Sequence, residues 1–222
     1  KECDWSSDVC SSDLGQTSAI AIIPDLIPAE MQMKQGWTHL YSTPRIWELK
    51  DGKICQQPHP GLKKLRKEEQ MIPVQTIRPG SNLAVHKGSH QLEILVDLIP
   101  AGCTRFGFVV GKGEKEETKI YYDFNTKQLV ADLTYSSQEE LIKKDIETGD
   151  YDLPDDKPVS LHLFIDGSVI EGFINGKDAF TTRIFPKYAD SNQVEIFTEG
   201  GNLQMVDLRF WELKSSNNQT DF

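Results

Sequence analysis

Asp166 and Glu171 are two carboxylates whose types and spacing could do acid–base chemistry. They lie in the segment 161–174, where apolar and polar residues alternate on both sides of Gly167-Ser168. A two-residue loop with Gly first favours a type II′ hairpin turn. That register puts Asp166 and Glu171 on one face, on a diagonal of about 7–8 Å. One interpretation is an inverting acid–base pair. We favour the other, a solvated hairpin face whose carboxylates accept hydrogen bonds in the turn.

The histidines and cysteines lack the neighbours that a metal site needs. His86 and His90 could ligate a metal, but the segment 87–89 between them favours a turn. The four cysteines form no Cys-x-x-Cys pair, and no His lies at zinc-finger spacing from them. We therefore expect no metal site, and we expect Cys55 and Cys103 to be small core residues.

The elements that must position these residues are β strands, because the chain alternates at period two almost throughout. Further strands are expected at 91–98, 106–110, 119–124, 128–133, 193–197 and 203–213, with a hairpin loop at 125–127. In the strand 91–98 one face is apolar, formed by Leu92, Ile94, Val96 and Leu98. In the hairpin the turn pairs Asp166 with Val169 and gathers Leu161, Leu163, Ile165, Ile170 and Ile174 on one face.

Two polar segments interrupt the strands. Gly111-Lys112-Gly113 is not a phosphate loop, because no Lys-Ser/Thr pair and no helix follow it, and we expect residues 114–117 to form a solvated loop. The one helix expected is SQEELIKK at 137–144, with Ser137 as N-cap and Glu140 at the capping-box position.

Composition sets limits on the class of protein. The chain has 222 residues, a net charge of -10 and 38% hydrophobic residues, which is typical of a globular protein. The acidic balance argues against nucleic acid as a partner. No apolar run reaches the roughly 18 residues of a membrane span, so no membrane partner is expected. Many short strands with frequent turns predict an all-β fold, an antiparallel β sandwich or a barrel.

Two segments carry a more specific signal than strand alternation. They are GWTHLYSTPRIWELKDGKICQQPHPGLKKLR at 36–66 and LHLFIDGSVIEGFINGKDAFTTRIFP at 161–186. Together they resemble glycoside hydrolase family 32, the β-fructosidases that include invertases, levanases, inulinases and sucrose-6-phosphate hydrolases. The matching residues are Ser42, Pro44, Arg45, Gln56, Gln57, Pro58, Leu62, Leu65, Arg66, Asp166, Ser168, Glu171, Phe173, Asn175, Thr182, Arg183 and Pro186. Leu133 departs from the family, which usually has Arg there.

The resemblance implies a concanavalin/lectin-like jelly roll preceded by part of a five-bladed β-propeller. Residues 15–45 would be a remnant of the last propeller blade, 46–70 a linker and first sandwich strand, 71–214 the C-terminal β sandwich and 215–222 a polar tail. Residues 1–14 contain Ser-Ser-Asp twice, and SSDVCSSDL resembles translated sequencing-adapter DNA. We expect a non-native leader there; the alternative is a genuine disordered leader.

The resemblance also implies a fragment of an enzyme. The family cleaves fructosyl bonds with retention, using an Asp nucleophile in a motif like W.NDPNG, a Glu acid/base in a motif like EC and a stabilising Asp in a motif like RDP. We expect all three motifs to be missing here. The intact enzyme would hydrolyse sucrose or fructans, whereas this chain would have no catalytic residue, cofactor or metal of its own.

The expected partner is the N-terminal β-propeller of the same protein. The interface candidates in and beside the propeller-closing segment are Trp37, Tyr41, Arg45 and Trp47. Sucrose or fructans would be bound through the intact enzyme, and a second copy of the chain is the other partner considered. The rival hypothesis is a free-standing lectin-like sandwich that binds glycans.

Overall fold

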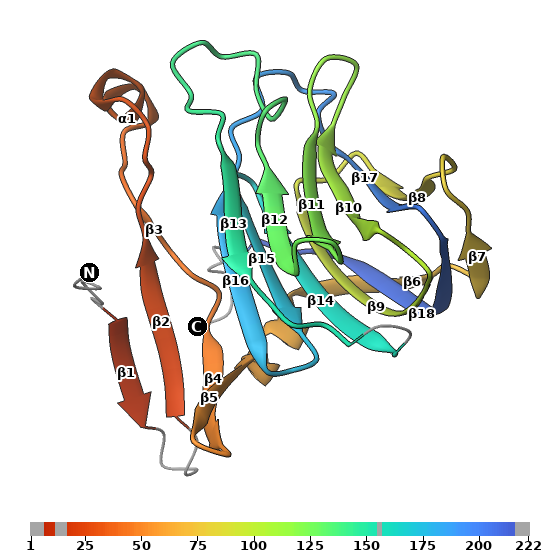
Figure 1. Ribbon diagram of the computed structural model, residues 1–222. Coiled ribbons are helices and arrows are strands. Elements are labelled where there is room, and N and C mark those ends of the chain that lie inside the picture. The colour runs from red at the N-terminus through yellow and green to blue at the C-terminus, as the bar shows by residue number, and fades with distance from the viewer. Residues whose placement is uncertain (1–6, 12–16, 155–156, 216–222) are drawn as a thin grey trace.

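The computed structural model describes residues 7–11, 17–154 and 157–215, with the backbone alone at 7–11 (Figure 1). Its strands form three antiparallel sheets, so the expected all-β sandwich is confirmed. The polar tail from 216 onward and most of the expected leader lie outside the described residues. No helix of the described part has the length and apolarity needed to cross a membrane.

The N-terminal sheet lies on one side of the molecule, beside the sandwich (Figure 1). Its strand order is β1-β2-β4-β5, and the short β3 also pairs with β2. The bounds are β1 Ser7–Ser11, β2 Thr17–Ile23, β3 Leu40–Tyr41, β4 Arg45–Lys50 and β5 Lys53–Pro58. The helix α1 (Ala29–Gln35) lies between β2 and β3, and the 3₁₀ helix η1 (Pro60–Leu65) leads into the sandwich. Strands from the expected propeller remnant (15–45) and from the expected linker (46–70) therefore pair in one sheet. The 3₁₀ helix η1 connects this sheet to the sandwich.

The sandwich consists of a six-stranded and a seven-stranded sheet. The six-stranded sheet contains, in order, β13 Ile146–Asp150, β12 Gln128–Asp132, β11 Thr118–Asp123, β10 Arg105–Lys112, β17 Gln193–Glu199 and β8 Leu83–Lys87. The seven-stranded sheet contains β16 Asp178–Arg183, β15 Val169–Ile174, β14 Val159–Asp166, β9 Gln91–Ala101, β18 Asn202–Leu213 and β6 Arg66–Met71, with β7 Gln75–Ile77 paired to β18.

The register of the β14–β15 hairpin is the one that the alternation predicts. Asp166 pairs with Val169, and Leu161 pairs with Ile174. Gly167 adopts a φ of 57°, a left-handed conformation that glycine reaches without strain. The turn and the apolar alternation therefore specify the same register. A slip by one residue would turn the apolar side chains away from the core.

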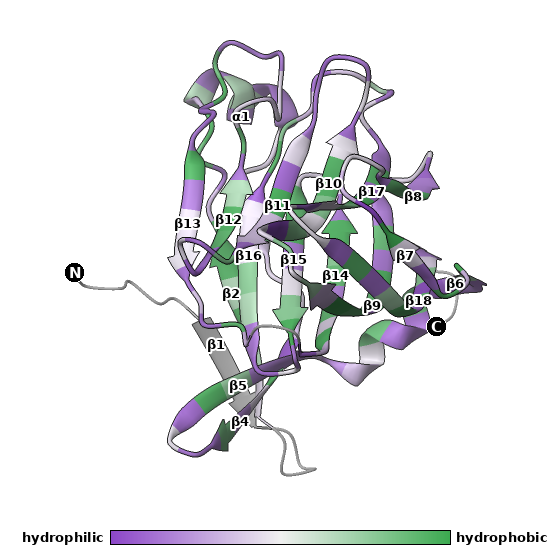
Figure 2. Cartoon of the chain, turned by 45° about the vertical axis from the view of Figure 1, so that its right-hand side comes forward, coloured by the Kyte–Doolittle hydropathy of each residue, from purple (hydrophilic) through white to green (hydrophobic). Residues whose placement is uncertain are grey.

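The core lies between the two sandwich sheets. Leu92, Ile94 and Leu98 on β9 are 0% exposed, so the predicted apolar face is the buried one. Strand hydropathy alternates visibly along the sandwich (Figure 2). Cys55 and Cys103 are buried free thiols, as expected.

The helix expected at 137–144 is wrong, because this segment forms turns. Ser137 Oγ accepts a hydrogen bond from Glu139 N at 3.0 Å, which closes a local turn. Gln138 N donates to Glu116 Oε1 at 2.6 Å, a tertiary bond that fixes the start of the segment. Helices this short are marginal without tertiary packing, and here only Ile142 is a buried apolar residue within the expected span. The helix that does form, α1, was not anticipated.

The solvated loop expected at 114–117 is also wrong for Glu116, which is 2% exposed. Its carboxylate accepts hydrogen bonds from Gln138 N, Lys187 N, Tyr188 N and Ser191 Oγ. Burial raises the pKa of Glu116, but these hydrogen bonds outweigh it and hold the pKa below its usual value. Glu116 therefore ties three loops together at one end of the sandwich.

Candidate functional site

The outer face of the seven-stranded sheet bears buried charge where the N-terminal segment crosses it. Glu93 on β9 and Glu171 on β15 are each 1% exposed and point away from the apolar core face. A buried carboxylate needs an opposite charge or several donors. Arg45 on β4 supplies both to Glu171, and Arg66 at the start of β6 supplies both to Glu93.

The first cluster joins β4 to β15. The Arg45 guanidinium forms an ion pair with Glu171 and donates to Gln56 Oε1 at 2.9 Å and Thr181 Oγ1 at 2.8 Å. Thr43 N donates to the second oxygen of the Glu171 carboxylate. The carboxylate is thus fully enclosed by groups from β4, the segment before it and β16.

The second cluster joins the start of β6 to β9. Arg66 donates to both oxygens of Glu93, with Nε at 2.8 Å from Oε2. His162 Nε2 lies 2.7 Å from Glu93 Oε1, and the Arg66 guanidinium stacks 3.7 Å above the Trp211 ring. Burial raises the pKa of Glu93, but the hydrogen bonds from Arg66 and His162 outweigh it, and the pKa lies below its usual value.

A third pair fixes the loop that follows β2. Asp25 is 0% exposed, and Arg183 Nη1 on β16 donates to its Oδ1 at 2.7 Å. His39 N donates to the other oxygen at 2.9 Å, while Arg183 Nη2 donates to Ser168 Oγ. Burial raises the pKa of Asp25, yet Arg183 and the His39 amide hold it below the ordinary value. Two buried ion pairs, Arg45–Glu171 and Arg183–Asp25, thus attach the N-terminal segment to one sheet of the sandwich, and Arg66–Glu93 joins two strands within that sheet.

The predicted carboxylate pair takes a different form. Asp166 is exposed near the turn, whereas Glu171 is buried under β4. The solvated face is therefore wrong for Glu171, because the N-terminal segment covers the strand at that point. His86 lies 3.3 Å from Glu212 across the β8 side of the sandwich, and His90 is exposed. In the described residues no three His, Cys, Asp or Glu side chains group as metal ligands.

The four interface candidates fall into two groups. Trp37 and Tyr41 are 46% and 72% exposed on the surface of the N-terminal segment. Arg45 and Trp47 are half-buried between β4 and the sandwich. Asp25 and Glu93 were missed by sequence reasoning. A carboxylate at a polar position of a strand carries no signal of what covers that strand.

One sequence expectation about motifs needs correction. Glu2-Cys3 is a Glu-Cys pair, so the expectation that this dipeptide is missing is wrong. It lies outside the described residues, and the sequence has no Asn-Asp-Pro or Arg-Asp-Pro to accompany it.

Comparison with known proteins agrees with this architecture. Residues 61–212 match the family model described as glycosyl hydrolases family 32 C terminal. Sucrose-6-phosphate hydrolase of Staphylococcus xylosus is 29% identical over 168 residues, covering 75% of this chain and 33% of that protein. Levanase of Bacillus subtilis is 29% identical over 198 residues, covering 84% of this chain and 29% of that protein.

Among solved structures, fructan 1-exohydrolase IIa of Cichorium intybus superposes with a TM-score of 0.85 at 20% identity. The superposition covers 95% of this chain and 48% of that one. The chain spans about a third of the length of the curated relatives it matches. With the family model covering most of the sandwich, the chain belongs to glycosyl hydrolase family 32 and contains its C-terminal β-sandwich domain.

Proposed function

We propose that this chain is the structural C-terminal module of a β-fructosidase. In the intact enzyme it packs against a β-propeller that hydrolyses β-fructofuranosyl bonds in sucrose or fructans with retention. The observation that carries the proposal is the docking of the N-terminal part of the chain on the sandwich by two buried arginine–carboxylate pairs, Arg45–Glu171 and Arg183–Asp25. Such a module holds a propeller blade in a defined orientation. The names of the relatives, which include levanase and sucrose-6-phosphate hydrolase, support the substrate class.

The N-terminal segment presents a surface suited to such a partner. Apart from Trp37 and Tyr41, large apolar side chains are exposed at Leu26 (74%) and Met33 (83%). Exposed large apolar residues gathered in one segment of a chain are typical of an interaction surface. We assign this surface to the propeller, with Trp37 and Tyr41 as its aromatic anchors.

The activity part of the proposal is tested by incubating the purified chain with sucrose, inulin and levan. The expected result is no release of fructose, because the Asn-Asp-Pro and Arg-Asp-Pro motifs are absent. Measurable turnover would contradict the proposal.

The interface part is tested with a chimera in which this chain replaces the corresponding C-terminal part of the Staphylococcus xylosus enzyme. The double substitution Trp37→Ser/Tyr41→Ser is expected to lower the yield of soluble, active chimera. The matched control is Tyr135→Ser, which removes another exposed aromatic (64%) from the sandwich surface. Equal losses in both variants would contradict the assignment of Trp37 and Tyr41.

A further inference from the structure

The outer face of the seven-stranded sheet has an exposed apolar region on β18 and on the chain that connects β6 to β7. Met71, Val74 and Val206 are 65%, 71% and 46% exposed there. Met71 at the end of β6 pairs with Arg209, and β7 pairs with the start of β18, so the connecting chain with Val74 runs alongside Val206. We call this region the β18 patch, and its residues are Met71, Val74, Asp97, Val206, Asp207 and Arg209.

The charged part of the β18 patch consists of two carboxylates and one guanidinium. Asp97 on β9 pairs directly with Asp207 on β18, and Arg209 follows two residues later on the same face. Arg209 Nε donates to Asp207 Oδ2 at 3.0 Å, whereas Asp97 forms no ion pair or side-chain hydrogen bond with the described residues. Like charges directly opposite each other on a sheet are destabilising. Asp97 therefore lacks the cation that Glu93, on the same strand, has in Arg66.

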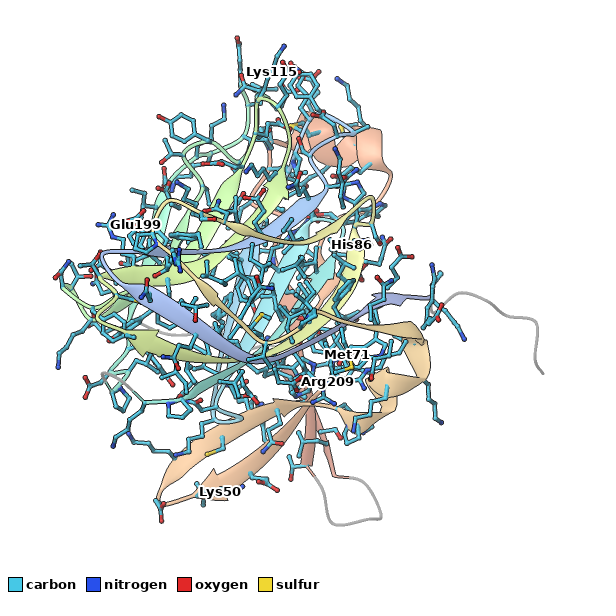
Figure 3. The ribbon with its side chains drawn as sticks, turned by 90° about the vertical axis from the view of Figure 1, so that its right-hand side faces the viewer. Lys50, Met71, His86, Lys115, Glu199 and Arg209 are labelled. Atoms are coloured by element: carbon cyan, nitrogen blue, oxygen red, sulfur yellow. The ribbon has the colours of Figure 1, made fainter. Side chains whose placement is uncertain are left out.

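The β18 patch lies away from the N-terminal sheet. In Figure 1, β7 is at the right of the molecule and the N-terminal sheet is at the left. Figure 3 shows the molecule from the right-hand side and labels Met71 close to Arg209, with Lys50 of the β4–β5 hairpin below them. A propeller that packs on the N-terminal sheet would leave this region open. The β18 patch is therefore available to a different partner.

The arrangement of charge favours a second copy of this chain as that partner. A partner with charges of one sign would pair with Arg209 or with Asp97 and would be repelled by the other. A second copy brings both charges, because a twofold axis can place Arg209 of each copy beside Asp97 of the other. The guanidinium has five N–H donors, so Arg209 can keep its bond to Asp207 while it binds a second carboxylate.

We propose that the β18 patch is the interface of a symmetric dimer of this chain. Arg209 of each copy pairs with Asp97 of the other, and Met71, Val74 and Val206 pack across the twofold axis. An apolar centre with a polar rim is the usual anatomy of a protein interface. Because the patch is small, the dimer is weak and its population depends on concentration. The interface uses the sandwich alone, so this proposal can fail without affecting the propeller contact proposed above.

Sedimentation velocity of the purified chain over a range of concentrations tests for the dimer. The same series with Trp37→Ser/Tyr41→Ser removes association through the surface assigned to the propeller. We expect the sedimentation coefficient to rise with concentration in both proteins. A monomer at all concentrations up to about 1 mM would overturn the proposal. Association that disappears in Trp37→Ser/Tyr41→Ser would also overturn it, because the copies would then meet through the other surface.

Charge substitutions test the pairing between copies. Arg209→Asp places like charges at both contacts and should raise the dissociation constant of the dimer by about tenfold or more. The swapped variant Asp97→Arg/Arg209→Asp restores opposite charges across the axis and should recover most of the association. A swapped variant that is folded and no better than Arg209→Asp would contradict the pairing.

A further variant tests the apolar part and leaves the charged residues in place. Val74→Glu puts a carboxylate in the apolar centre and should abolish the dimer while thermal unfolding shows a folded protein. The matched control is Leu141→Glu, which changes an aliphatic residue that is 54% exposed outside the patch and should leave the dimer unchanged. The proposal is wrong if Val74→Glu associates as strongly as the wild type.

Discussion

The two faces of the seven-stranded sheet are stabilised by different physics. On the inner face Ile94, Leu163 and Ile170 pack against the other sheet with at most 1% of their surface exposed. On the outer face Glu93 and Glu171 are equally buried, but each is enclosed by an arginine and further donors. Apolar packing is tolerant of exchange at constant volume, whereas a buried carboxylate demands one particular partner. The outer face therefore specifies where the N-terminal segment docks.

The β4–β5 hairpin of the N-terminal sheet and the loops that Glu116 joins lie apart in space. Figure 3 labels Lys50, at the tip of the β4–β5 hairpin, and Lys115, in the loop after β10, at opposite ends of the molecule. At the Lys115 end the loops are joined by Glu116, a carboxylate bound by backbone amides and a hydroxyl without an arginine. At the docking face the carboxylates pair with arginines. Hydrogen bonds to Glu116 hold loops of the sandwich together, whereas the Arg45–Glu171 and Arg183–Asp25 ion pairs join two parts of the chain.

The largest effect is expected from unpairing the outer face. Arg66→Ala leaves Glu93 buried without its main partner and should lower the free energy of unfolding by about 3–5 kcal/mol. Arg66→Met/Glu93→Met removes both charges and should be less destabilised than the single variant. Urea unfolding followed by circular dichroism measures both. A double variant as unstable as Arg66→Ala would show that the lost charge pairing is not the cause.

Acid should destabilise the protein through its buried carboxylates, because the apolar inner face has no group that titrates. Folding lowers the pKa values of Glu93 and Glu116 below 4.5, and that of Asp25 below 3.8. Carboxylates with a lowered folded pKa stabilise the protein above the unfolded pKa and lose that contribution as pH falls through the folded pKa. The free energy of unfolding should therefore fall steadily below about pH 4.5.

The matched control for acid is Glu93→Gln, which should have a shallower pH dependence than the wild type over the same range. Unfolding in urea at several pH values from neutral to acid gives both curves. Identical slopes would rule out Glu93 as a source of the acid sensitivity.

Trimming the inner face should cost less. Ile94→Val removes one methylene from a residue that is 0% exposed and should lower the free energy of unfolding by about 0.5–1.5 kcal/mol. Because no charge is involved, this loss should be the same at neutral and acid pH while the protein remains folded. A loss of stability that changes with pH would contradict the proposal that the inner face is stabilised by apolar packing alone.

The smallest effect is expected at the hairpin tip. Leu49 is 77% exposed, and Leu49→Ser should change the free energy of unfolding by no more than about 0.5 kcal/mol. Thermal unfolding beside the wild type measures it. A larger loss would show that Leu49 packs on a surface in solution, most simply that of a second copy.

Local patterns predicted the sandwich strands well. The β14–β15 register, the loop between β11 and β12 and the buried face of β9 follow from alternation and turn residues that act over a few positions. The prediction of a helix at 137–144 failed because a short segment with Ile142 as its one buried apolar residue has too little packing to stabilise a helix. The burial of Glu171 could not be anticipated, since a strand's alternation separates two faces without saying what covers either.

By itself, the sequence determined the central strands of the sandwich, their apolar faces and the family, because each depends on short-range period, turn chemistry or motif. The edge strands β8, β13 and β16 were not anticipated. Tertiary structure alone decided that Arg45 meets Glu171, Arg66 meets Glu93 and Arg183 meets Asp25, pairs separated by 126, 27 and 158 residues. The physical reason is that a buried charge is stable only beside its partner, and the fold brings those partners together from distant parts of the chain.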